Sequence, residues 1–151
     1  MSIRFVSPRL GLLCLAVPLF TTVGWGFDNA SRDKLVGVWQ SQESGDSAGV
    51  WTIEAKDGDV FKLIESHGDQ KLLEIECTTS GKDCKVKDSG KNAKVSLWFN
   101  GDKLVGLETK GDEVVKRRFT VTETGDTLDI EVMPISPSGK TEVAHYKRVH
   151  Q

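Results

Sequence analysis

The sequence contains few cysteines and little excess charge, and both shortages restrict what the protein can be. Three cysteines among 151 residues are too few for a fold held together mainly by disulfides. Twenty basic and 22 acidic residues give a formal net charge of −2, which argues against a strongly basic nucleic-acid-binding protein. Hydrophobic residues make up 38% of the chain and charged residues 28%, which is typical of a globular protein rather than a disordered one.

The sequence also has little that indicates catalysis or metal binding. It contains no His-Glu-x-x-His zinc motif and no phosphate-binding glycine-rich loop before a helix. Asp57-Gly58-Asp59 is too short for a helix–loop–helix calcium site, and the three histidines are scattered. The basic run 116–118 divides between the two faces of a strand, so it forms no stripe for nucleic acid. We therefore expect a protein that is not an enzyme, without a cofactor, a metal or a nucleic-acid partner.

Residues 1–26 have the features of a secretory signal peptide. Two arginines precede an apolar run over 10–23, and Gly24 and Gly26 place small residues before a cleavage site. The run is shorter than the roughly 20 apolar residues that a membrane-spanning helix needs, although an uncleaved anchor is the alternative. We expect an exported protein, periplasmic or secreted, whose residues 27–151 form a single domain without a membrane span.

Two cysteines, Cys77 and Cys84, remain after the predicted cleavage. An even number of cysteines in an exported chain indicates a disulfide. Six residues between them fit neither a Cys-x-x-Cys redox motif nor the usual zinc spacing, which are the alternatives. The sequence predicts a Cys77–Cys84 disulfide that closes a turn-rich loop.

Glycine-centred turn signals recur along the mature chain and separate short segments with alternating apolar and polar residues. Asn100-Gly101 is the strongest of these signals, because this pair favours a two-residue hairpin turn. The alternation is typical of strands with one buried face, and it predicts an all-β antiparallel up-and-down meander of about 8–9 strands. The expected strands lie near 35–42, 49–55, 60–66, 73–77, 95–99, 103–110, 115–121, 128–132 and 141–149.

Two segments are expected to depart from this pattern. Ser31 is a suitable cap for a short helical turn that ends at Leu35. Pro134 and Pro137 cannot donate ladder hydrogen bonds, so we expect 133–139 to be an irregular hairpin tip rather than a central strand.

The segment Gly37-Val38-Trp39, at the start of a strand-rich chain, resembles the lipocalin and fatty-acid-binding superfamily. The resemblance implies a lipocalin-like, calycin-type barrel, in which Gly37 and Trp39 belong to the closed end. There Trp39 is covered by a basic residue of the last strand, either Arg148 or Lys147. The stretch 117–128 also resembles small exported bacterial proteins of unassigned function with such a barrel.

One departure from this family concerns the last strand. Fatty-acid-binding proteins hold the ligand carboxylate with an Arg-x-Tyr sequence, whereas here Ala144 stands two residues before Tyr146. The resemblance therefore does not imply fatty-acid binding in that manner.

Arg117 is the most informative polar residue, because it shares a strand face with Phe119 and should point inward. A guanidinium removed from water needs a partner. Arg117 is therefore either an anchor for an acidic ligand or one half of an internal ion pair, for example with Glu65. The aromatic residues expected to line an internal pocket, or simply to fill the core, are Trp51, Phe61, Phe119 and Tyr146.

Two functions are consistent with these features. The first is an exported, non-catalytic protein that binds a small apolar or amphipathic ligand in an internal barrel pocket. The second is an interaction module with a filled core, such as an inhibitor, that binds an envelope or secreted protein through its outer face or loops.

Overall fold

The computed structural model describes residues 29–43, 48–86 and 93–150. The predicted signal peptide lies outside these residues, so it stays a prediction. Within the described ranges the chain forms one helix and ten strands. In chain order they are α1 (Asn29–Leu35), β1 (Gly37–Ser41), β2 (Gly49–Ala55), β3 (Val60–His67), β4 (Gln70–Thr78), β5 (Ser80–Lys85), β6 (Lys94–Asn100), β7 (Lys103–Lys110), β8 (Glu113–Val121), β9 (Thr127–Ser136) and β10 (Glu142–Arg148).

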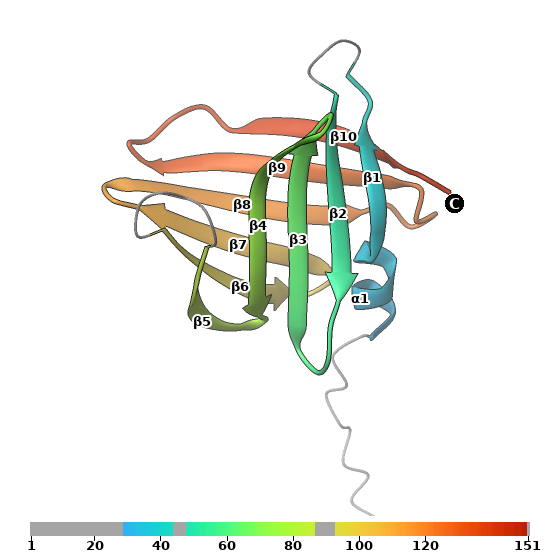
Figure 1. Cartoon of the computed structure of the whole chain (residues 1–151), viewed down its shortest axis with the longest axis horizontal. Coiled ribbons are helices and arrows are strands. Elements are labelled where there is room, and N and C mark those ends of the chain that lie inside the picture. The colour runs from blue at the N-terminus through green and yellow to red at the C-terminus, as the bar shows by residue number, and fades with distance from the viewer. Residues whose placement is uncertain (1–28, 44–47, 87–92, 151) are drawn as a thin grey trace, which may run out of the picture.

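The ten strands form one antiparallel sheet that curls into a nearly closed barrel. Their order in the sheet is β4-β3-β2-β1-β10-β9-β8-β7-β6-β5, so the first and last strands of the chain pair with each other. In Figure 1, β1 to β4 stand upright in front of β7 to β10, which run across behind them. The predicted all-β meander is confirmed. A short helix that ends at Leu35 precedes the first strand as expected, but it begins at Asn29, so Ser31 lies inside the helix instead of capping it.

The two ends of the sheet are β4 and β5, and we call the line where they meet the seam. β4 contacts both β5 and β6, but it shares no hydrogen-bonded ladder with either of them in the part of the chain that the structure describes. The predicted disulfide is present and joins Cys77 of β4 to Cys84 of β5, with their Cα atoms 5.6 Å apart. The bond therefore connects the two ends of the sheet across the seam.

The prediction of 8–9 strands was wrong, because the described residues form ten strands and the prediction lacked β5. The segment between the cysteines was expected to be a loop, but it returns along β6 as a hydrogen-bonded strand. Its sequence is polar, and the register shifts between Ser80 and Asp83, so it shows no alternating pattern. An edge strand with a bulge and no apolar face leaves no periodic signal in the sequence.

The prediction of an irregular tip over 133–139 was also wrong in part, because β9 continues through Pro134 to Ser136. Pro134 pairs with Val115 of β8 next to a shift of register, and the ladder to β10 reaches only as far as Val132. This end of β9 is thus paired on one side only, which is where a strand tolerates a proline.

The core is formed by the inward-facing residues of the strands. Register places residues opposite one another on the same face, as with Phe61 and Cys77 or Leu63 and Ile75. The side chains with the least exposure are all apolar. Within the described ranges they are Leu35, Trp39, Trp51, Ile53, Phe61, Leu63, Val95, Leu97, Leu104, Val105, Phe119 and Leu128. Leu35 belongs to α1, and Val105 is buried on the opposite face of β7 from Leu104.

One end of the barrel is closed by Trp39 and two arginines. The guanidinium of Arg148 lies 4.2 Å from the centre of the Trp39 ring. Arg32 of α1 lies over the rings of Phe61 and Phe99, at 5.1 and 5.8 Å, and ion-pairs with Asp59 at 2.8 Å. The charged heads thus cover aromatic faces that would otherwise meet water.

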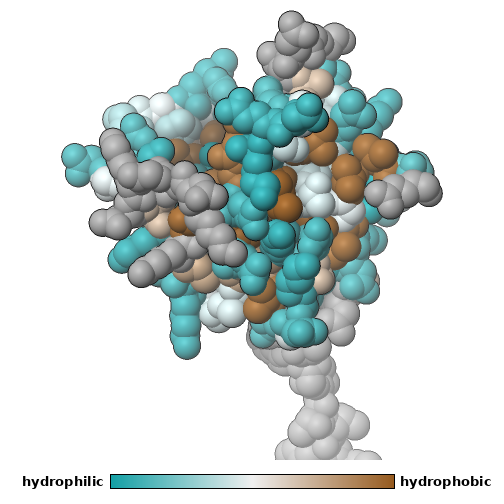
Figure 2. Space-filling model, in the orientation of Figure 1, coloured by the Kyte–Doolittle hydropathy of each residue, from teal (hydrophilic) through white to brown (hydrophobic). Residues whose placement is uncertain are grey.

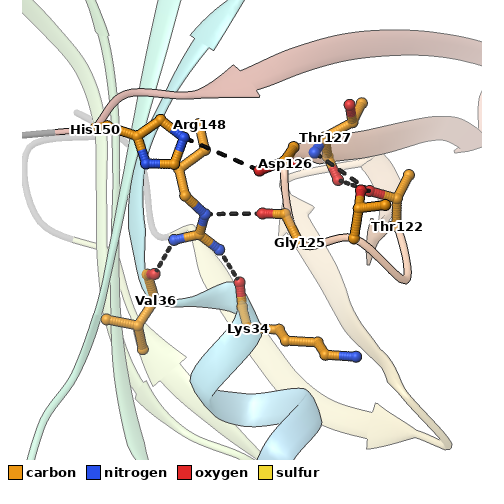
Figure 3. A network of polar contacts seen from close by, with 9 residues as sticks. Lys34, Val36, Thr122, Gly125, Asp126, Thr127, Arg148 and His150 are labelled. Carbon is orange, nitrogen blue, oxygen red and sulfur yellow. Dashed lines mark hydrogen bonds and ion pairs between the residues drawn. The ribbon is translucent and has the colours of Figure 1, made fainter.

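Arg148 also binds three carbonyl groups from two separate backbone segments (Figure 3). Its guanidinium donates hydrogen bonds to the carbonyl oxygens of Gly125 (2.8 Å), Val36 (2.7 Å) and Lys34 (2.5 Å). A Cβ atom at Gly37 would lie 2.5 Å from Nη1 of Arg148, and the φ angle of +151° also favours glycine there. The glycine of the Gly-x-Trp segment is therefore needed for the arginine to reach the backbone.

The outer face of the sheet carries charged side chains. Figure 2 shows hydrophilic residues over the face formed by β3 and β4, with hydrophobic residues between them. Lys62 of β3 forms an ion pair with Glu74 of β4 at 3.4 Å. No helix within the described residues is both long and apolar enough to cross a membrane.

Candidate functional site

A small pocket lies inside the barrel beside the seam. Its lining comes from five strands on both sides of the seam: Leu63, Ile75, Val95, Leu97, Gly106, Glu108, Arg117 and Phe119. The free space is about 10 Å³, which is room for one water molecule. Sites for small organic ligands usually measure about 300–1,000 Å³, so side chains or strands must move before such a ligand can enter.

The pocket adjoins the disulfide. Ile75 stands two residues before Cys77 on β4, and Val95 of β6 pairs with Cys84. Beyond the disulfide, no ladder of hydrogen bonds joins the described part of β4 to β6. The seam is therefore the part of the barrel wall where separation breaks the fewest backbone hydrogen bonds.

Arg117 and Glu108 form the polar end of the pocket. Arg117 faces the interior, as the alternation along β8 predicts, and its Nη1 donates a hydrogen bond to Oε2 of Glu108. Their side chains are 22% and 17% exposed. Gly106 pairs with Arg117 across the β7–β8 ladder, and its lack of a side chain leaves space beside the guanidinium.

Glu65 lies near this pair without being hydrogen-bonded to it. The sequence suggested Glu65 as the partner of Arg117, but the structure gives that position to Glu108. Partial burial raises the pKa of the Glu65 carboxyl above its usual value, and the charge of Glu108 adds to the increase. The positive charge of Arg117 and the nearby His67 only partly oppose this rise in pKa. Glu65 is therefore a partly buried carboxyl group without an ion-pair partner among the described residues.

Trp51 and Tyr146 lie beside the cluster. Burial raises the pKa of the Tyr146 hydroxyl, whereas a hydrogen bond from the Trp51 side chain lowers it and the charge of Glu65 raises it further. The Trp51 ring also meets Phe119 edge to face, with the ring centres 5.3 Å apart. Trp51 thus links the pocket wall at Phe119 to Tyr146.

The structure brings only some of the expected ligand-binding residues together. Arg117 and Phe119 line the pocket, and Trp51 contacts it through Phe119. Phe61 lies at the closed end against Phe99, with ring centres 5.7 Å apart. Tyr146 is buried beside Trp51 but does not line the pocket.

Glu108 and Arg32 are not among the residues predicted from the sequence. Alternation from Leu104 through Gly106 indicates that Glu108 points inward, and the Lys110–Glu113 hairpin register brings it near Arg117. The alternation is visible in the sequence, but placing Glu108 near Arg117 also requires the register of the β7–β8 hairpin. The sequence contains no pattern that indicates the position of Arg32, because its place over Phe61 depends on how the helix packs against the barrel.

One hydrolase-like motif was also missed. Residues 45–49 read Gly-Asp-Ser-Ala-Gly, which matches the Gly-x-Ser-x-Gly pattern. In hydrolases that motif stands between a strand and a helix, whereas here it falls between the strands β1 and β2. Most of it lies outside the described residues. Within the described residues, no three His, Cys, Asp or Glu side chains form a group that could hold a metal ion.

No protein-family model matches the sequence, and no curated protein matches it. Solved structures do share its fold. A secretory abundant heat soluble protein from Ramazzottius varieornatus is 15% identical with a TM-score of 0.65, covering 77% of this chain and 96% of that protein. The fluorescent protein UnaG is 17% identical with a TM-score of 0.62, covering 78% of this chain and 98% of that protein.

A fatty-acid-binding protein from Schistosoma mansoni, solved in complex with arachidonic acid, is similar to the same extent. It is 19% identical with a TM-score of 0.62, covering 80% of this chain and 99% of that protein. At these identities the likeness concerns the fold. The chain therefore has a lipocalin-like, calycin-type barrel, as the Gly-x-Trp resemblance implies.

Proposed function

We propose that the protein is an exported, non-catalytic binding protein for a small apolar or amphipathic molecule that is held inside the barrel. The observation that carries this proposal is the pocket at the seam, which has apolar walls and a polar end formed by Arg117 and Glu108. An apolar wall with a few convergent polar groups is typical of ligand sites. The similarity to barrels named for fatty-acid binding supports the same function.

The ligand enters through the seam in this proposal. The pocket is nearly filled in its present form. Among the described residues no ladder joins β4 to β6, so their separation is opposed mainly by side-chain packing and by the Cys77–Cys84 disulfide between β4 and β5. The predicted signal peptide and the disulfide support a location outside the cytoplasm, in the periplasm or the medium.

Dye binding tests the proposal. An environment-sensitive apolar dye should bind the folded protein and quench Trp51, because this ring contacts the pocket wall at Phe119. Gly106→Ala should weaken binding several-fold, since the new Cβ would lie 3.2 Å from Cδ2 of Leu97 and push that side chain into the pocket. Thr120→Val, on the opposite face of β8 from Phe119, is the matched control. If Gly106→Ala left dye binding unchanged, the dye would bind outside the pocket, which would contradict the proposal.

The small volume of the pocket favours a second candidate, an interaction module with a filled core. Such a protein would bind an envelope or secreted protein through its outer face or loops. Native mass spectrometry of the protein purified from its host separates the two functions. A retained small molecule supports ligand binding, whereas a retained protein without any small molecule supports the interaction module.

A further inference from the structure

The interior of the barrel carries more negative than positive charge next to the pocket. Glu65, Glu108 and Arg117 all face inward, from β3, β7 and β8 respectively. Arg117 is already hydrogen-bonded to Glu108. Among the described residues Glu65 has neither a hydrogen bond nor an ion pair. The charges of Arg117, His67 and Glu108 act on its carboxyl group, and its own charge acts on Tyr146. Two carboxylates therefore face the interior near one guanidinium, which is hydrogen-bonded to Glu108 and not to Glu65.

This arrangement opposes a ligand with a carboxylate head. Such a head would have to take Arg117 away from Glu108, and Glu108 would then be left as a partly buried charge without a partner. It would also bring a third negative charge next to Glu65, where weak solvent screening strengthens the repulsion.

A ligand with a cationic head meets the opposite situation. An ammonium group can donate hydrogen bonds to Glu65 and leave the Arg117–Glu108 pair intact. It would neutralise the excess negative charge of the cluster. The apolar tail would lie against Leu63, which precedes Glu65 by two residues on the same face of β3, and against Ile75 across the β3–β4 ladder.

We propose that the barrel selects amphipathic amines, with the ammonium head on Glu65 and the tail in the pocket at the seam. This inference rests on the proposed binding function and specifies the class of ligand. It assigns different roles to the two carboxylates, because Glu65 receives the ligand and Glu108 keeps Arg117 from attracting anions.

Three probes of equal tail length test the inference. Octylamine, octanol and octanoate are titrated into the disulfide-intact protein at pH 8 and low salt, with isothermal calorimetry as the measurement. We expect octylamine to bind at least about tenfold more tightly than octanoate, the effect of one charge-assisted hydrogen bond. Tighter binding of octanoate would overturn the inference and leave the proposed function standing. If none of the three probes binds, the proposed function itself fails.

Two variants with opposite expected effects sharpen the test. Glu65→Gln should lower the affinity for octylamine about tenfold and leave that for octanol unchanged. Glu108→Gln frees Arg117 and should raise the affinity for octanoate. Glu76→Gln, exposed on the outer side of β4, is the matched control and should change neither. An octylamine affinity that survives Glu65→Gln in a folded protein would contradict the assigned role of Glu65.

Discussion

Arg148 shows how a single side chain can hold the closed end of a barrel together. Its three hydrogen bonds reach the β8–β9 turn at Gly125 and the chain that enters β1 at Lys34 and Val36. The charged head also covers Trp39, whose indole nitrogen donates to the Leu35 carbonyl oxygen at 3.0 Å.

Replacing this arginine should therefore be costly. We expect Arg148→Ala to lower the free energy of unfolding by about 3 kcal/mol, because it leaves backbone carbonyl groups without donors and uncovers Trp39. Urea unfolding followed by tryptophan fluorescence measures the change. Lys147→Ala is the matched control, since this neighbour is exposed and should cost less than about 0.5 kcal/mol. Equal losses in the two variants would contradict the bridging role of Arg148.

Because of Glu65, the stability of the folded protein should depend on pH. Burial raises its pKa in the folded protein, so folding favours the protonated form. The contribution of Glu65 to the free energy of unfolding is most favourable at a pH below the pKa of Glu65 in the unfolded chain. It is lost as the pH rises through the pKa of Glu65 in the folded protein. Glu65→Gln should consequently raise the melting temperature at pH 7 to 8, and the difference from the wild type should shrink as the pH falls toward 4.

Thermal unfolding of both proteins across this pH range measures the effect. Glu76→Gln provides the comparison, because its side chain is exposed. A melting temperature lowered by Glu65→Gln at neutral pH would show that the ionised carboxylate stabilises the fold, contrary to this account.

For individual residues, alternation in the sequence predicted that Arg117 points inward. The family resemblance implied that a basic residue of the last strand, Arg148 or Lys147, covers Trp39. The sequence did not predict that Glu108 rather than Glu65 binds Arg117. Both carboxylates face the interior, and only the separation of the strands around the barrel decides between them. Alternation specifies a face of a strand, but not the distance across the barrel.

Among the elements, β5 depends most on covalent support. It is short, polar and bulged, and within the described ranges its one ladder is with β6. Cys84 connects it to β4 across the seam. Strands with alternating apolar residues were predictable from the sequence, whereas β5 was not, because an edge strand without an apolar face depends on its neighbours.

Loss of the disulfide should loosen the seam. We expect the Cys77→Ala/Cys84→Ala variant to lose about 2–3 kcal/mol of stability, the chain-entropy effect of closing so short a loop. Its amide hydrogens in β5 should exchange faster than those in β2, which is paired on both sides. Urea unfolding and hydrogen exchange measure the two effects, and reductant should destabilise the wild type but not the variant. Unchanged exchange in β5 would show that the seam holds without the bond.

The whole molecule is organised by a pairing that local patterns do not reveal. β1 and β10 meet with Trp39 opposite Arg148, residues more than 100 positions apart in the sequence. Turn signals and alternation predicted consecutive hairpins. The need to cover the edges of so many short strands indicated a closed barrel or a tightly rolled sandwich, and the Gly-x-Trp resemblance implied the barrel. Closure arises from the twist and curl of the entire sheet, which no single segment encodes.

The adjacency of β1 and β10 has a consequence for the connectivity of the chain. Among the ten described strands, every other ladder joins strands that follow each other in sequence, and the sheet is interrupted between β4 and β5, near Thr79. A circular permutant that links the end of β10 to α1 and opens the chain at Thr79 would have ten strands in sequential order. All of its ladders would be local, so it should refold faster than the natural chain in stopped-flow experiments. Its new ends would also carry the two cysteines, so that one disulfide would turn a linear meander into a covalent ring.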